Sequence, residues 1–492
     1  MSEKRQFRAI RGVRDILPAE TALWNRVEQT ACEVFGTYGY GEIRLPIFEE
    51  TELFARSVGA ETDIVSKEMY TFRDPRADDV FDVLEKFGAL RREATAQEGE
   101  KDELLKEMLQ KGGPSLQACR ELSLGIGVTA FFSMMEHIAT AAQAGETGQL
   151  MTLRPEATAS VCRAYIEHGM QTWPGDVKLY YIGPMFRRER PQKGRYRQFY
   201  QIGAEVLGQS DAPAIDAEVI EMLMVFFEKA GLSGATLYIN SIGCSECRPR
   251  YVETLRAALV DRINELGADS QRRVETNPLR VLDSKLEHEQ AVIEKLPRIS
   301  DHLCDACRAH FAEVKKQLEL RGVAYQENWR LVRGLDYYMR TTFEITAPGL
   351  GAQDAVCGGG RYDGLVELLG GPPTKGIGFA IGTDRLVLSL QETGREEAAA
   401  GTAAFIAWMG AAAYPAAVKL AQRLRSAGVA AELPAEEMKL KKALGLASKL
   451  GAKYAVIIGE NEVATGKFAL KRLADGQQES LGEDEVVARL KG

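Results

Sequence analysis

The sequence predicts a multidomain protein of mixed helices and strands, with a separate α/β module at its C-terminal end. Residues 180–202 form two extended runs around a turn that contains Pro191 and Gly194, which is the pattern of a β-hairpin. From about Gly401, strand-like runs alternate with helix-like runs, a pattern typical of a mixed or parallel sheet covered by helices. The length of 492 residues fits about three domains.

Composition and charge limit the classes of function. The chain is 45% hydrophobic and 27% charged, which is ordinary for a soluble globular enzyme. Its net charge of −8 argues against a general nucleic-acid binder, so local basic regions must make any such contact. Residues 401–492 hold nine lysines and four arginines against ten acids, which makes this module the better candidate to contact a polyanion. The N-terminus lacks the apolar core of a signal peptide, and no long uncharged apolar run occurs, so we expect a cytoplasmic protein without a membrane span.

The first part of the chain begins with a predicted helix and strand. Apolar residues recur at helical spacing over residues 19–35, so we expect a helix that ends at Gly36. A strand is expected over residues 40–48, where Pro46 marks a sheet edge or a strand end. A short strand follows at residues 69–72.

Residues 75–148 are predicted to be a helical insertion within a β-hairpin. They are rich in Glu, Lys, Ala and Leu and lie between the strand-like segments MYTF and LMTLR. Helices are expected near residues 79–94, 101–110 and 128–144. We expect this segment to pack on the body of the protein or on another chain, and His137 to be a packed or surface residue.

The predicted hairpin carries an unusual density of arginine. Residues 185–200 contain five arginines and one lysine against a single acid, Glu189. Arginine binds phosphate oxygens through two parallel hydrogen bonds, so this pattern indicates a phosphate-rich ligand. The alternative is a solvated charged loop.

The remaining segments alternate between the two kinds of secondary structure. A helix is expected from Thr158 to Tyr165, with Pro155 near its N-terminus. Further strands are expected at residues 237–240, 329–333, 342–345 and 376–382, and further helices at residues 211–231 and from Thr383, which we expect to cap its helix. In the C-terminal module, strands are expected at residues 403–409, 430–433, 454–458 and 467–473, and helices at 413–427, 438–450 and 483–490.

Four cysteines have the spacing of a metal site. Cys244-x2-Cys247 and Cys304-x2-Cys307 form the two-pair pattern of a tetrahedral Zn²⁺ centre. The pairs flank a predicted inserted domain of charged helices and weak strands, so a metal would clamp its two ends. Four thiolates leave no open position for substrate, and the zinc would therefore be structural. The alternative is four free thiols in a reducing compartment.

An ordered set of motifs resembles the bacterial histidyl-tRNA synthetases over nearly the whole chain: RGVRDILP, a helix and strand ending at Pro46, TLRPEAT, FRRERPQKGRYRQF, LVRGLDYY, GGGRYDG and GIGFAIGTDRL. The segment ending at Pro46 is similar to class II motif 1, the Arg187 hairpin to motif 2, and residues 382–386 to motif 3. LVRGLDYY and GGGRYDG resemble the two histidine-specific signatures. Ala157 stands where glycine is usual, and Asp384 where a glutamate is more common.

The resemblance implies a fold and a reaction. It implies an α+β catalytic domain on a six-stranded antiparallel sheet, a C-terminal α/β anticodon-binding domain, helical insertions, and a homodimer formed partly through motif 1. The ranges are 1–74, 149–243 and 327–397 for the catalytic core, 75–148 and 244–326 for the insertions, and 401–492 for the anticodon-binding domain. The family makes histidyl-adenylate from histidine and ATP with Mg²⁺, releases pyrophosphate, and transfers the histidyl group to the 3′ end of tRNA-His.

The resemblance also implies roles for single residues. Arg187 matches an arginine on the α-phosphate and Arg385 one on the γ-phosphate, whereas Arg333 reaches the α-phosphate and the histidine carboxylate from the opposite side. These three are the expected catalytic residues. Glu189 matches the carboxylate that holds the adenine amino group, and Phe199 would stack on adenine.

The histidine and tRNA sites are implied in the same way. The expected histidine-binding residues are Glu156 and Thr158 for the α-amino group, Arg195 and Gln201 on the carboxylate side, Arg333, and Glu205, Tyr337, Tyr338 and Tyr362 around or near the imidazole ring. Arg190 and Gln192 are expected to meet the tRNA acceptor end. From the pattern alone, Glu156 and Thr158 could equally be helix caps, Glu205 a partner in a structural ion pair, and the tyrosines core residues.

Two rival interpretations remain. The regulatory subunit of ATP phosphoribosyltransferase resembles the catalytic domain but lacks the anticodon-binding domain and loses the catalytic arginines. Arg187, Arg333 and Arg385 are all present here, as is the C-terminal module, which favours the ligase. A tRNA-binding module that no longer catalyses is the third interpretation.

Overall fold

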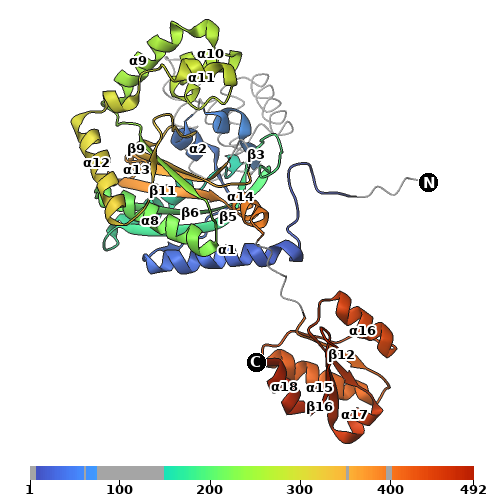
Figure 1. The fold of residues 1–492 in the computed structure, drawn as a ribbon. Helices are drawn as coiled ribbons and strands as arrows, with labels where there is room; N and C mark the ends of the chain where they lie inside the picture. Colours follow the sequence, from blue (N-terminus) through green and yellow to red (C-terminus); the bar gives the residue numbers. More distant parts are fainter. Residues whose placement is uncertain (1–6, 60–61, 75–148, 351–353, 395–401, 492) are drawn as a thin grey trace, which may run out of the picture. The chain divides into compact units, whose positions relative to one another are not determined.

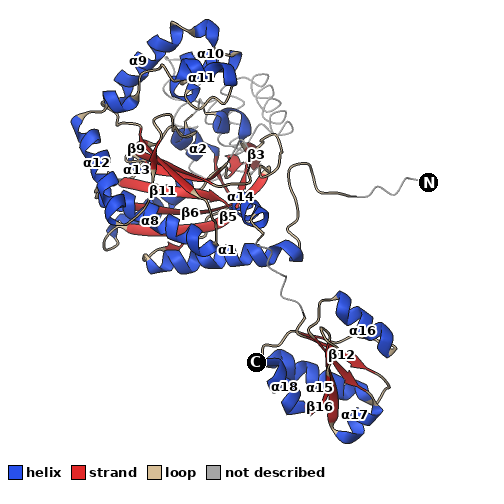
Figure 2. Ribbon diagram, viewed as in Figure 1, coloured by secondary structure: helices blue, strands red, loops and turns tan. Residues whose placement is uncertain are grey.

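The computed structural model describes residues 7–59, 62–74, 149–350, 354–394 and 402–491. The chain divides into two compact units (Figure 1), namely Met1–Asp15 with Trp24–Arg395 and Ile16–Leu23 with Glu396–Gly492. Each unit contains a sheet with helices packed against it (Figure 2). No helix in the described part of the chain is long and apolar enough to cross a membrane.

The first unit is built on an eight-stranded sheet. Its strands, in spatial order, are β1 (Gly41–Glu42), β5 (Val177–Phe186), β6 (Gln198–Gly208), β11 (Lys375–Gly382), β10 (Ala355–Arg361), β9 (Met339–Thr346), β7 (Thr236–Ser241) and β8 (Gln326–Glu327). Each pairing in the run from β5 to β7 is antiparallel. At the two edges of the sheet, β1 pairs in parallel with β5 and β8 pairs in parallel with β7. The prediction of a six-stranded antiparallel sheet is therefore wrong. Two short segments cover the open hydrogen-bonding edges of β5 and β7 and make the sheet mixed.

The described helices of the first unit are α1 (Pro18–Thr37, of which residues 24–37 belong to this unit), α2 (Thr51–Val58), α7 (Thr158–Glu167), α8 (Pro213–Ala230), α9 (Arg248–Val260), α10 (Ala268–Thr276), α11 (Glu287–Ile293), α12 (Asp305–Leu320), α13 (Leu365–Leu368) and α14 (Thr383–Glu392). A π-helical turn covers Ile64–Glu68, and 3₁₀ turns cover Met170–Thr172, Ile263–Glu265, Pro278–Val281 and Ile299–His302. Helices α1 and α8 lie together on one face of the sheet (Figure 1), because the ring of Phe35 in α1 contacts both Phe226 in α8 and Phe379 in β11. This face forms a buried apolar layer.

A second, three-stranded sheet flanks the segment predicted as an insertion. Its order is β2 (Phe48–Glu50), β4 (Gln149–Leu153) and β3 (Tyr70–Asp74), and both pairings are antiparallel. Residues 75–148 thus connect neighbouring strands of one sheet. The helices predicted near 79–94, 101–110 and 128–144, and His137, lie outside the described residues.

Several local predictions are wrong in detail. Gly36 lies inside α1, and Gly39, with a φ of +82°, provides the left-handed turn beyond the helix. The strand expected over residues 40–48 is split into β1 and β2, and residues 329–333 form a turn and irregular backbone instead of a strand. Thr383 is the first residue of α14 and makes no capping hydrogen bond. In each case the residue types allow both conformations, and packing selects one.

The second unit has a mixed five-stranded sheet, where the sequence predicted four strands in a mixed or parallel sheet. Its order is β13 (Ala431–Glu432), β12 (Ala404–Trp408), β14 (Tyr454–Ile458), β15 (Lys467–Arg472) and β16 (Gln478–Gly482). The first three strands are parallel and the last two antiparallel. Its helices are α15 (Ala413–Ser426), α16 (Leu440–Lys449), α17 (Glu460–Thr465) and α18 (Glu483–Lys491), of which α17 was not predicted, like strand β16.

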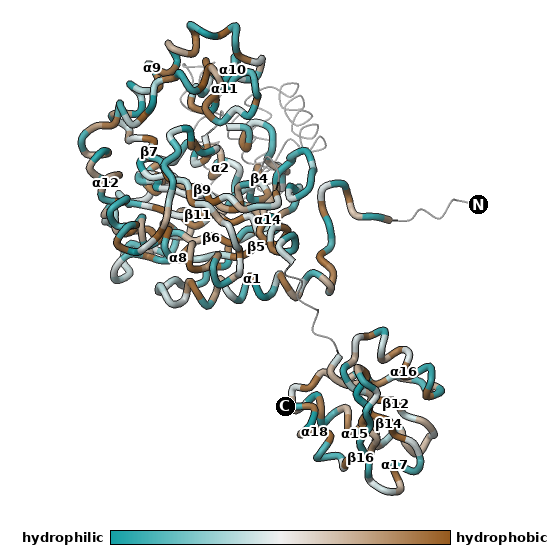
Figure 3. Tube along the Cα trace, in the orientation of Figure 1, coloured by the Kyte–Doolittle hydropathy of each residue, from teal (hydrophilic) through white to brown (hydrophobic). Residues whose placement is uncertain are grey.

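Apolar residues lie on both faces of this sheet, which explains its covering by helices. One buried cluster joins α15 and α18 through Leu420 and Val486, and the other joins α16 through Ala443 and Ala447. Figure 3 shows the same distribution, with hydrophobic segments along the strands and alternating hydropathy along the helices. The alternation of strands and helices in the sequence thus reflects a three-layer arrangement.

Candidate active site

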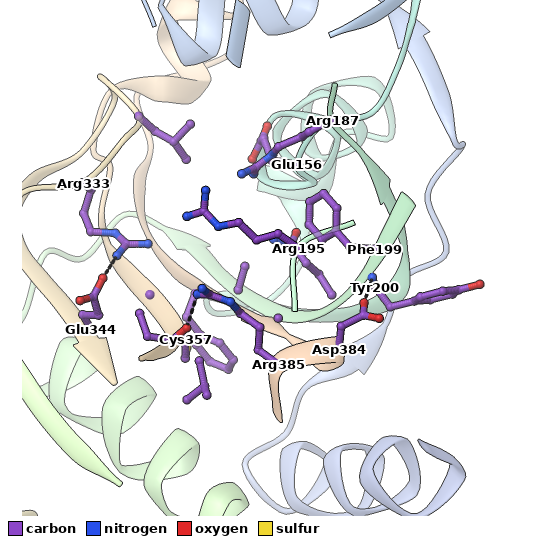
Figure 4. A pocket seen from close by; sticks show the side chains of 18 of the residues that line it. Glu156, Arg187, Arg195, Phe199, Tyr200, Arg333, Glu344, Cys357, Asp384 and Arg385 are labelled. Carbon is purple, nitrogen blue, oxygen red and sulfur yellow. Dashed lines mark hydrogen bonds and ion pairs between the residues drawn. The ribbon is translucent and has the colours of Figure 1, made fainter. Parts of the chain in front are cut away.

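A cavity of about 290 Å³ opens over the main sheet, between the β5–β6 hairpin, the N-terminal ends of α7 and α14, and the segment that precedes β9. Figure 4 shows arginines from these elements around one space. Most of the residues predicted from the sequence line it, namely Glu156, Thr158, Arg187, Glu189, Arg195, Phe199, Gln201, Arg333, Tyr337, Tyr338 and Arg385. Residues from distant parts of the sequence therefore form one site.

One side of the cavity is built by the hairpin. The Nε of Arg187 donates to the carbonyl oxygen of Pro155 at 2.9 Å, and its guanidinium carbon lies 5.2 Å from the centre of the Phe199 ring. Glu189 stands between two arginines, with its oxygens 3.8 Å from Arg187 and 3.1 Å from Arg195. These contacts fix the two guanidinium groups at the cavity wall.

The opposite side carries two more arginines. Arg385, in the first turn of α14, donates to the carbonyl oxygen of Ala355 at 2.5 Å. Burial, and then the positive charge of Arg195, lower the pKa of the Arg385 guanidinium. Arg333 pairs with Glu344 at 2.7 Å, and its buried Nε has no hydrogen-bond partner among the described residues. Like charges gathered in this way are stabilised by an anion between them.

The base of the cavity is polar and buried. The carboxylate of Glu156 accepts hydrogen bonds from the backbone N–H of Thr158 at 2.8 Å and of Ala159 at 3.0 Å. The hydroxyl of Tyr337 donates to it at 3.4 Å. Burial raises the pKa of Glu156. Glu156 thus stabilises the start of α7 and also lines the cavity. The sequence left open whether it caps a helix or faces a ligand site, and in the structure it does both.

Glu205 and Tyr362 lie behind the cavity wall and do not line it. Glu205 is 1% exposed and accepts hydrogen bonds from the hydroxyl of Thr158 at 2.7 Å and of Tyr362 at 2.6 Å. Burial raises the pKa of Glu205 to about 8. Among the described residues it makes no ion pair, so its partners are hydroxyl groups and not the cation that a structural ion pair would need.

Two glycines in the central strands make room for these side chains. A side chain at Gly358 in β10 would collide with the guanidinium of Arg333, and one at Gly378 in β11 would collide with the carboxylate of Glu205. The glycine-rich runs are therefore strands that polar side chains cross at close range. The sequence showed the glycines but not which side chains they admit.

Arg190 and Gln192 are the predicted residues that lie away from the cavity. Both are exposed at the tip of the hairpin, where the backbone groups of Gln192 and Arg195 exchange two hydrogen bonds across a tight turn. The tip is thus a defined surface feature beside the cavity and not part of its lining.

Sequence reasoning missed several residues that line or support the cavity. Glu344 pairs with Arg333, and the signal for it was an acid between the apolar residues Phe343 and Ile345 of a strand. Asp384 accepts a hydrogen bond from the backbone N–H of Tyr200 at 2.9 Å and approaches Arg14 at 3.5 Å. Asp384 therefore ties the start of α14 to β6 and to the N-terminal segment. The other lining residues that were missed include Tyr181, Tyr196, Tyr200, Leu335, Cys357 and Phe379.

The four predicted metal-ligating cysteines meet at one point. Their sulfur atoms all lie within 4.8 Å of one another, and the distances are 3.7 Å for Cys244–Cys247, 3.8 Å for Cys244–Cys304 and 3.9 Å for Cys247–Cys307. A tetrahedron with Zn–S bonds of about 2.3 Å has edges of about 3.8 Å. The cluster has the dimensions of a zinc centre, and none of these cysteines forms a disulfide.

Comparison with known proteins gives consistent results. Residues 134–386 match the family model described as histidyl-tRNA synthetase, and residues 403–492 match that of an anticodon binding domain. The chain is 50% identical over 485 residues to a histidine–tRNA ligase of Koribacter versatilis, covering 98% of this chain and 95% of that one. It is 48% identical to the histidine–tRNA ligase of Solibacter usitatus, covering 98% and 99%.

Solved structures agree on the fold. The crystal structure of apo S. aureus histidyl-tRNA synthetase superposes with a TM-score of 0.71 at 34% identity and covers 99% of this chain and 100% of that one. A Bacillus halodurans structure described as an ATP phosphoribosyltransferase regulatory subunit/histidyl-tRNA synthetase has a TM-score of 0.58 at 18% identity, covers 92% of this chain and 99% of that one, and shares the fold. The combination of the cavity, the two family matches and the full-length relatives shows that the chain belongs to the histidyl-tRNA synthetase family.

Proposed function

We propose that this protein is a histidine–tRNA ligase that makes histidyl-adenylate from histidine and ATP with Mg²⁺ and then charges the 3′ end of tRNA-His. The observation that carries the proposal is the cavity in which Arg187, Arg333 and Arg385 lie around a buried polar base. The carboxylate of the amino acid must attack the α-phosphate, which brings two anions together. Fixed arginines offset that repulsion and the charge that develops on the phosphoryl oxygens.

The hairpin side and Arg385 are proposed to bind ATP. Arg187 would contact the α-phosphate and Arg385 the γ-phosphate, with Mg²⁺ bridging the phosphates. Glu189 would hold the adenine amino group, and Phe199 would stack on the ring. Arg333 would hold the α-phosphate and the histidine carboxylate from the other side. The support is that these side chains line one cavity.

The buried base is proposed to select histidine. Glu156 and Thr158 would hold the α-amino group, and Arg195 and Gln201 would line the carboxylate side. Glu205, Tyr337, Tyr338 and Tyr362 would surround the imidazole ring or position the groups that do, because Glu205 and Tyr362 connect to the cavity through Thr158. A site whose polar groups pair with both ring nitrogens rejects an apolar amino acid, since those groups would then lose their partners.

The tRNA contacts and the assembly belong to the same proposal. Arg190 and Gln192 would meet the acceptor end, and residues 401–492, with their net charge of +3, the anticodon. The catalytic core would comprise residues 1–74, 149–243 and 327–397, with insertions at 75–148 and 244–326. We further propose that the protein works in the cytoplasm as a homodimer formed partly through the segment that ends at Pro46.

The four-cysteine cluster is proposed to bind one structural Zn²⁺. Its sulfur spacing matches a tetrathiolate centre, and all four ligand positions would be filled by protein, which leaves none for substrate. Metal analysis of protein purified without chelators would show about one equivalent of zinc. Metal-free protein of full stability would contradict the site.

The regulatory-subunit alternative predicts a chain without the catalytic arginines or the C-terminal domain. This chain contains Arg187, Arg333 and Arg385 in one cavity and matches the anticodon-binding model over residues 403–492. Both features favour the ligase.

Histidine-dependent ATP–pyrophosphate exchange tests the activation step, and charging of tRNA-His with labelled histidine tests the transfer. We expect exchange with histidine and little with phenylalanine, whose ring cannot pair with the polar base. Binding of tRNA-His without any exchange would contradict the ligase and favour a tRNA-binding module.

A further inference from the structure

The segment that carries Tyr337 and Tyr338 has a strained backbone where it enters β9. Arg340 has a φ of +50° and is the only residue other than glycine with a positive φ in the described part of the chain. The pairing of β9 with β10 shifts register at the same place, between Gly360 and Arg361. Such a conformation persists only where the surroundings hold it in several ways. The segment lines the cavity at Tyr337 and Tyr338, so whatever holds it also shapes the site.

Three hydrogen bonds hold this segment to a single neighbouring stretch. The backbone N–H of Arg340 donates to the carbonyl oxygen of Gly243 at 2.8 Å, and the N–H of Ile242 donates to the carbonyl oxygen of Arg340 at 2.8 Å. The guanidinium of Arg248 donates to the carbonyl oxygen of Tyr338. The Arg340 side chain is fixed separately by Asp211 at 2.7 Å.

The stretch that holds the segment is also half of the cysteine centre. Gly243 precedes Cys244, and a side chain at Gly243 would approach the sulfur of Cys247 to 2.8 Å. Arg248 follows Cys247, and its N–H donates to the carbonyl oxygen of Cys244 at 3.0 Å. Tyr338 belongs to the same buried cluster as these cysteines. The path of residues 242–248 therefore depends on how the sulfur atoms are held.

The other half of the centre comes from far along the chain. Cys304 precedes α12, and its sulfur lies 3.8 Å from that of Cys244, sixty positions earlier. A zinc ion would join these two halves by bonds to sulfur, and the filled centre would carry a net charge of −2 beside the positive Arg248. Without metal the sulfur atoms have no common partner, and the bonds that would join the two halves are lost.

We infer that the four-cysteine centre, acting through Arg248 and Gly243, fixes the backbone of residues 338–340 and thereby sets the affinity of the cavity for histidine. The inference rests on the proposed function and on the proposed zinc. It assigns the metal a role beyond stability of the inserted domain. It also makes Arg248 a positioning residue, because Arg248 contacts the backbone of Tyr338 and does not line the cavity.

The sharpest variant is Cys304→Ser, because residue 304 meets the 242–248 stretch across the sulfur cluster. We expect purified Cys304→Ser protein to lose its zinc and to show a KM for histidine at least about tenfold higher in pyrophosphate exchange, with a much smaller change in the KM for ATP. Hydrogen exchange of the amides of Ile242 and Arg340 should become faster. Cys32→Ser, in α1, is the matched control and should leave zinc content, both KM values and amide exchange unchanged.

The Arg248→Met variant tests whether the metal centre acts on the cavity through Arg248. This variant should keep its zinc yet raise the KM for histidine and speed exchange of the Arg340 amide. Arg256→Met is the control, because Arg256 lies on the same helix and donates instead to the carbonyl oxygen of Val274 at 3.2 Å. That variant should match the wild type in the KM for histidine.

Two results would overturn the inference. One is zinc-free wild-type protein with an ordinary KM for histidine. The other is a Cys304→Ser protein that loses zinc and melting temperature but keeps the wild-type KM and the wild-type protection of the Arg340 amide. If the wild type has no exchange activity, the proposed function fails, and the amide measurements with and without zinc still decide whether the centre controls residues 338–340.

Discussion

The hairpin side and the base of the cavity differ in solvent exposure and in the kind of groups that form them. On the hairpin side, the Arg187 and Arg195 side chains are 20% and 41% exposed, and both are held by the single carboxylate of Glu189. At the base, Glu156 and Glu205 are 4% and 1% exposed, and each accepts two or more hydrogen bonds from fixed donors. The hairpin side is accessible and cationic, and the base is buried and formed by carboxyl and hydroxyl groups.

This difference in exposure and charge suits two requirements of the reaction, the binding of phosphate and the selection of the amino acid. A cation with a nearby acid can exchange that partner for a phosphate as the ligand arrives, at little cost in desolvation. A buried group with all its hydrogen bonds made accepts only a ligand that replaces those bonds, because an unsatisfied group in a dry site is costly. We therefore expect the cationic side to determine the rate and the buried base to determine the choice of amino acid.

The largest effect is expected at Arg333, on the side of the cavity opposite the hairpin. Arg333→Ala should lower histidine-dependent pyrophosphate exchange by about 10²–10³-fold, since one preorganised donor to the transition state is worth roughly that much. Circular dichroism should show an unchanged fold. Arg330→Ala is the control, because Arg330 donates to Gln290 and to the carbonyl oxygen of Leu282 and should leave exchange near the wild-type rate. Near-normal exchange in Arg333→Ala would refute its role.

A single methyl group should produce the next largest effect. In Gly358→Ala the added carbon takes the space of the Arg333 guanidinium, so exchange should fall by roughly 10²-fold through displacement of that group. Gly36→Ala in α1 adds the same methyl group where nothing lies within 4 Å, and it should leave exchange intact while stabilising the helix by up to about 1 kcal/mol. Equal activities of the two variants would show that Arg333 does not need this space.

The buried base of the cavity should make the stability of the protein depend on pH. The pKa of Glu205 is raised to about 8, so between about pH 4.5 and 8 the folded protein keeps a proton that the unfolded chain releases. The contribution of Glu205 to stability is thus fully present below pH 4.5 and is lost as the pH rises toward 8, by at most about 1.4 kcal/mol per pH unit. Urea unfolding from pH 5 to 9 should show this decline in the wild type and a flatter profile in Glu205→Gln. Parallel profiles would mean that Glu205 does not titrate in this range.

The same variant tests selectivity. A glutamine at position 205 presents an amide N–H₂ to one of the two hydroxyls that now donate to the carboxyl group, so Thr158 or Tyr362 must reorient. The KM for histidine should rise by about tenfold, and the KM for ATP should change much less. A larger change in the KM for ATP than in that for histidine would contradict the division of the cavity into two sides.

The smallest effect is expected at the hairpin tip, which lies outside the cavity. Arg190 is exposed and does not line the cavity, so Arg190→Ala should leave pyrophosphate exchange unchanged. Charging of tRNA-His should fall a few-fold, and the loss should shrink at higher salt because an exposed arginine–phosphate contact is screened. A drop in exchange itself would place Arg190 in the ATP site instead.

Local patterns located part of the candidate site, and the resemblance to the synthetase family implied the rest. The basic run of the hairpin and the arginine in the first turn of α14 are local features, whereas the roles of Arg333, Tyr337 and Tyr338 came from the resemblance. Most residues predicted in these two ways line the cavity. The orientation of each side chain was not predictable, because Glu156 could cap a helix or face a ligand, and here it does both.

By itself, the sequence indicated most of the elements, a mixed or parallel sheet in the C-terminal unit, the basic hairpin and four cysteines with the spacing of a metal site. These features depend on periodicity, turns and spacing, which act over a few residues. Only the tertiary structure decided that two parallel edge strands complete the main sheet, that Gly358 and Gly378 admit Arg333 and Glu205, and that Arg248 donates to the backbone of Tyr338. Those contacts join residues far apart in the chain, where close packing and not local propensity selects the partner.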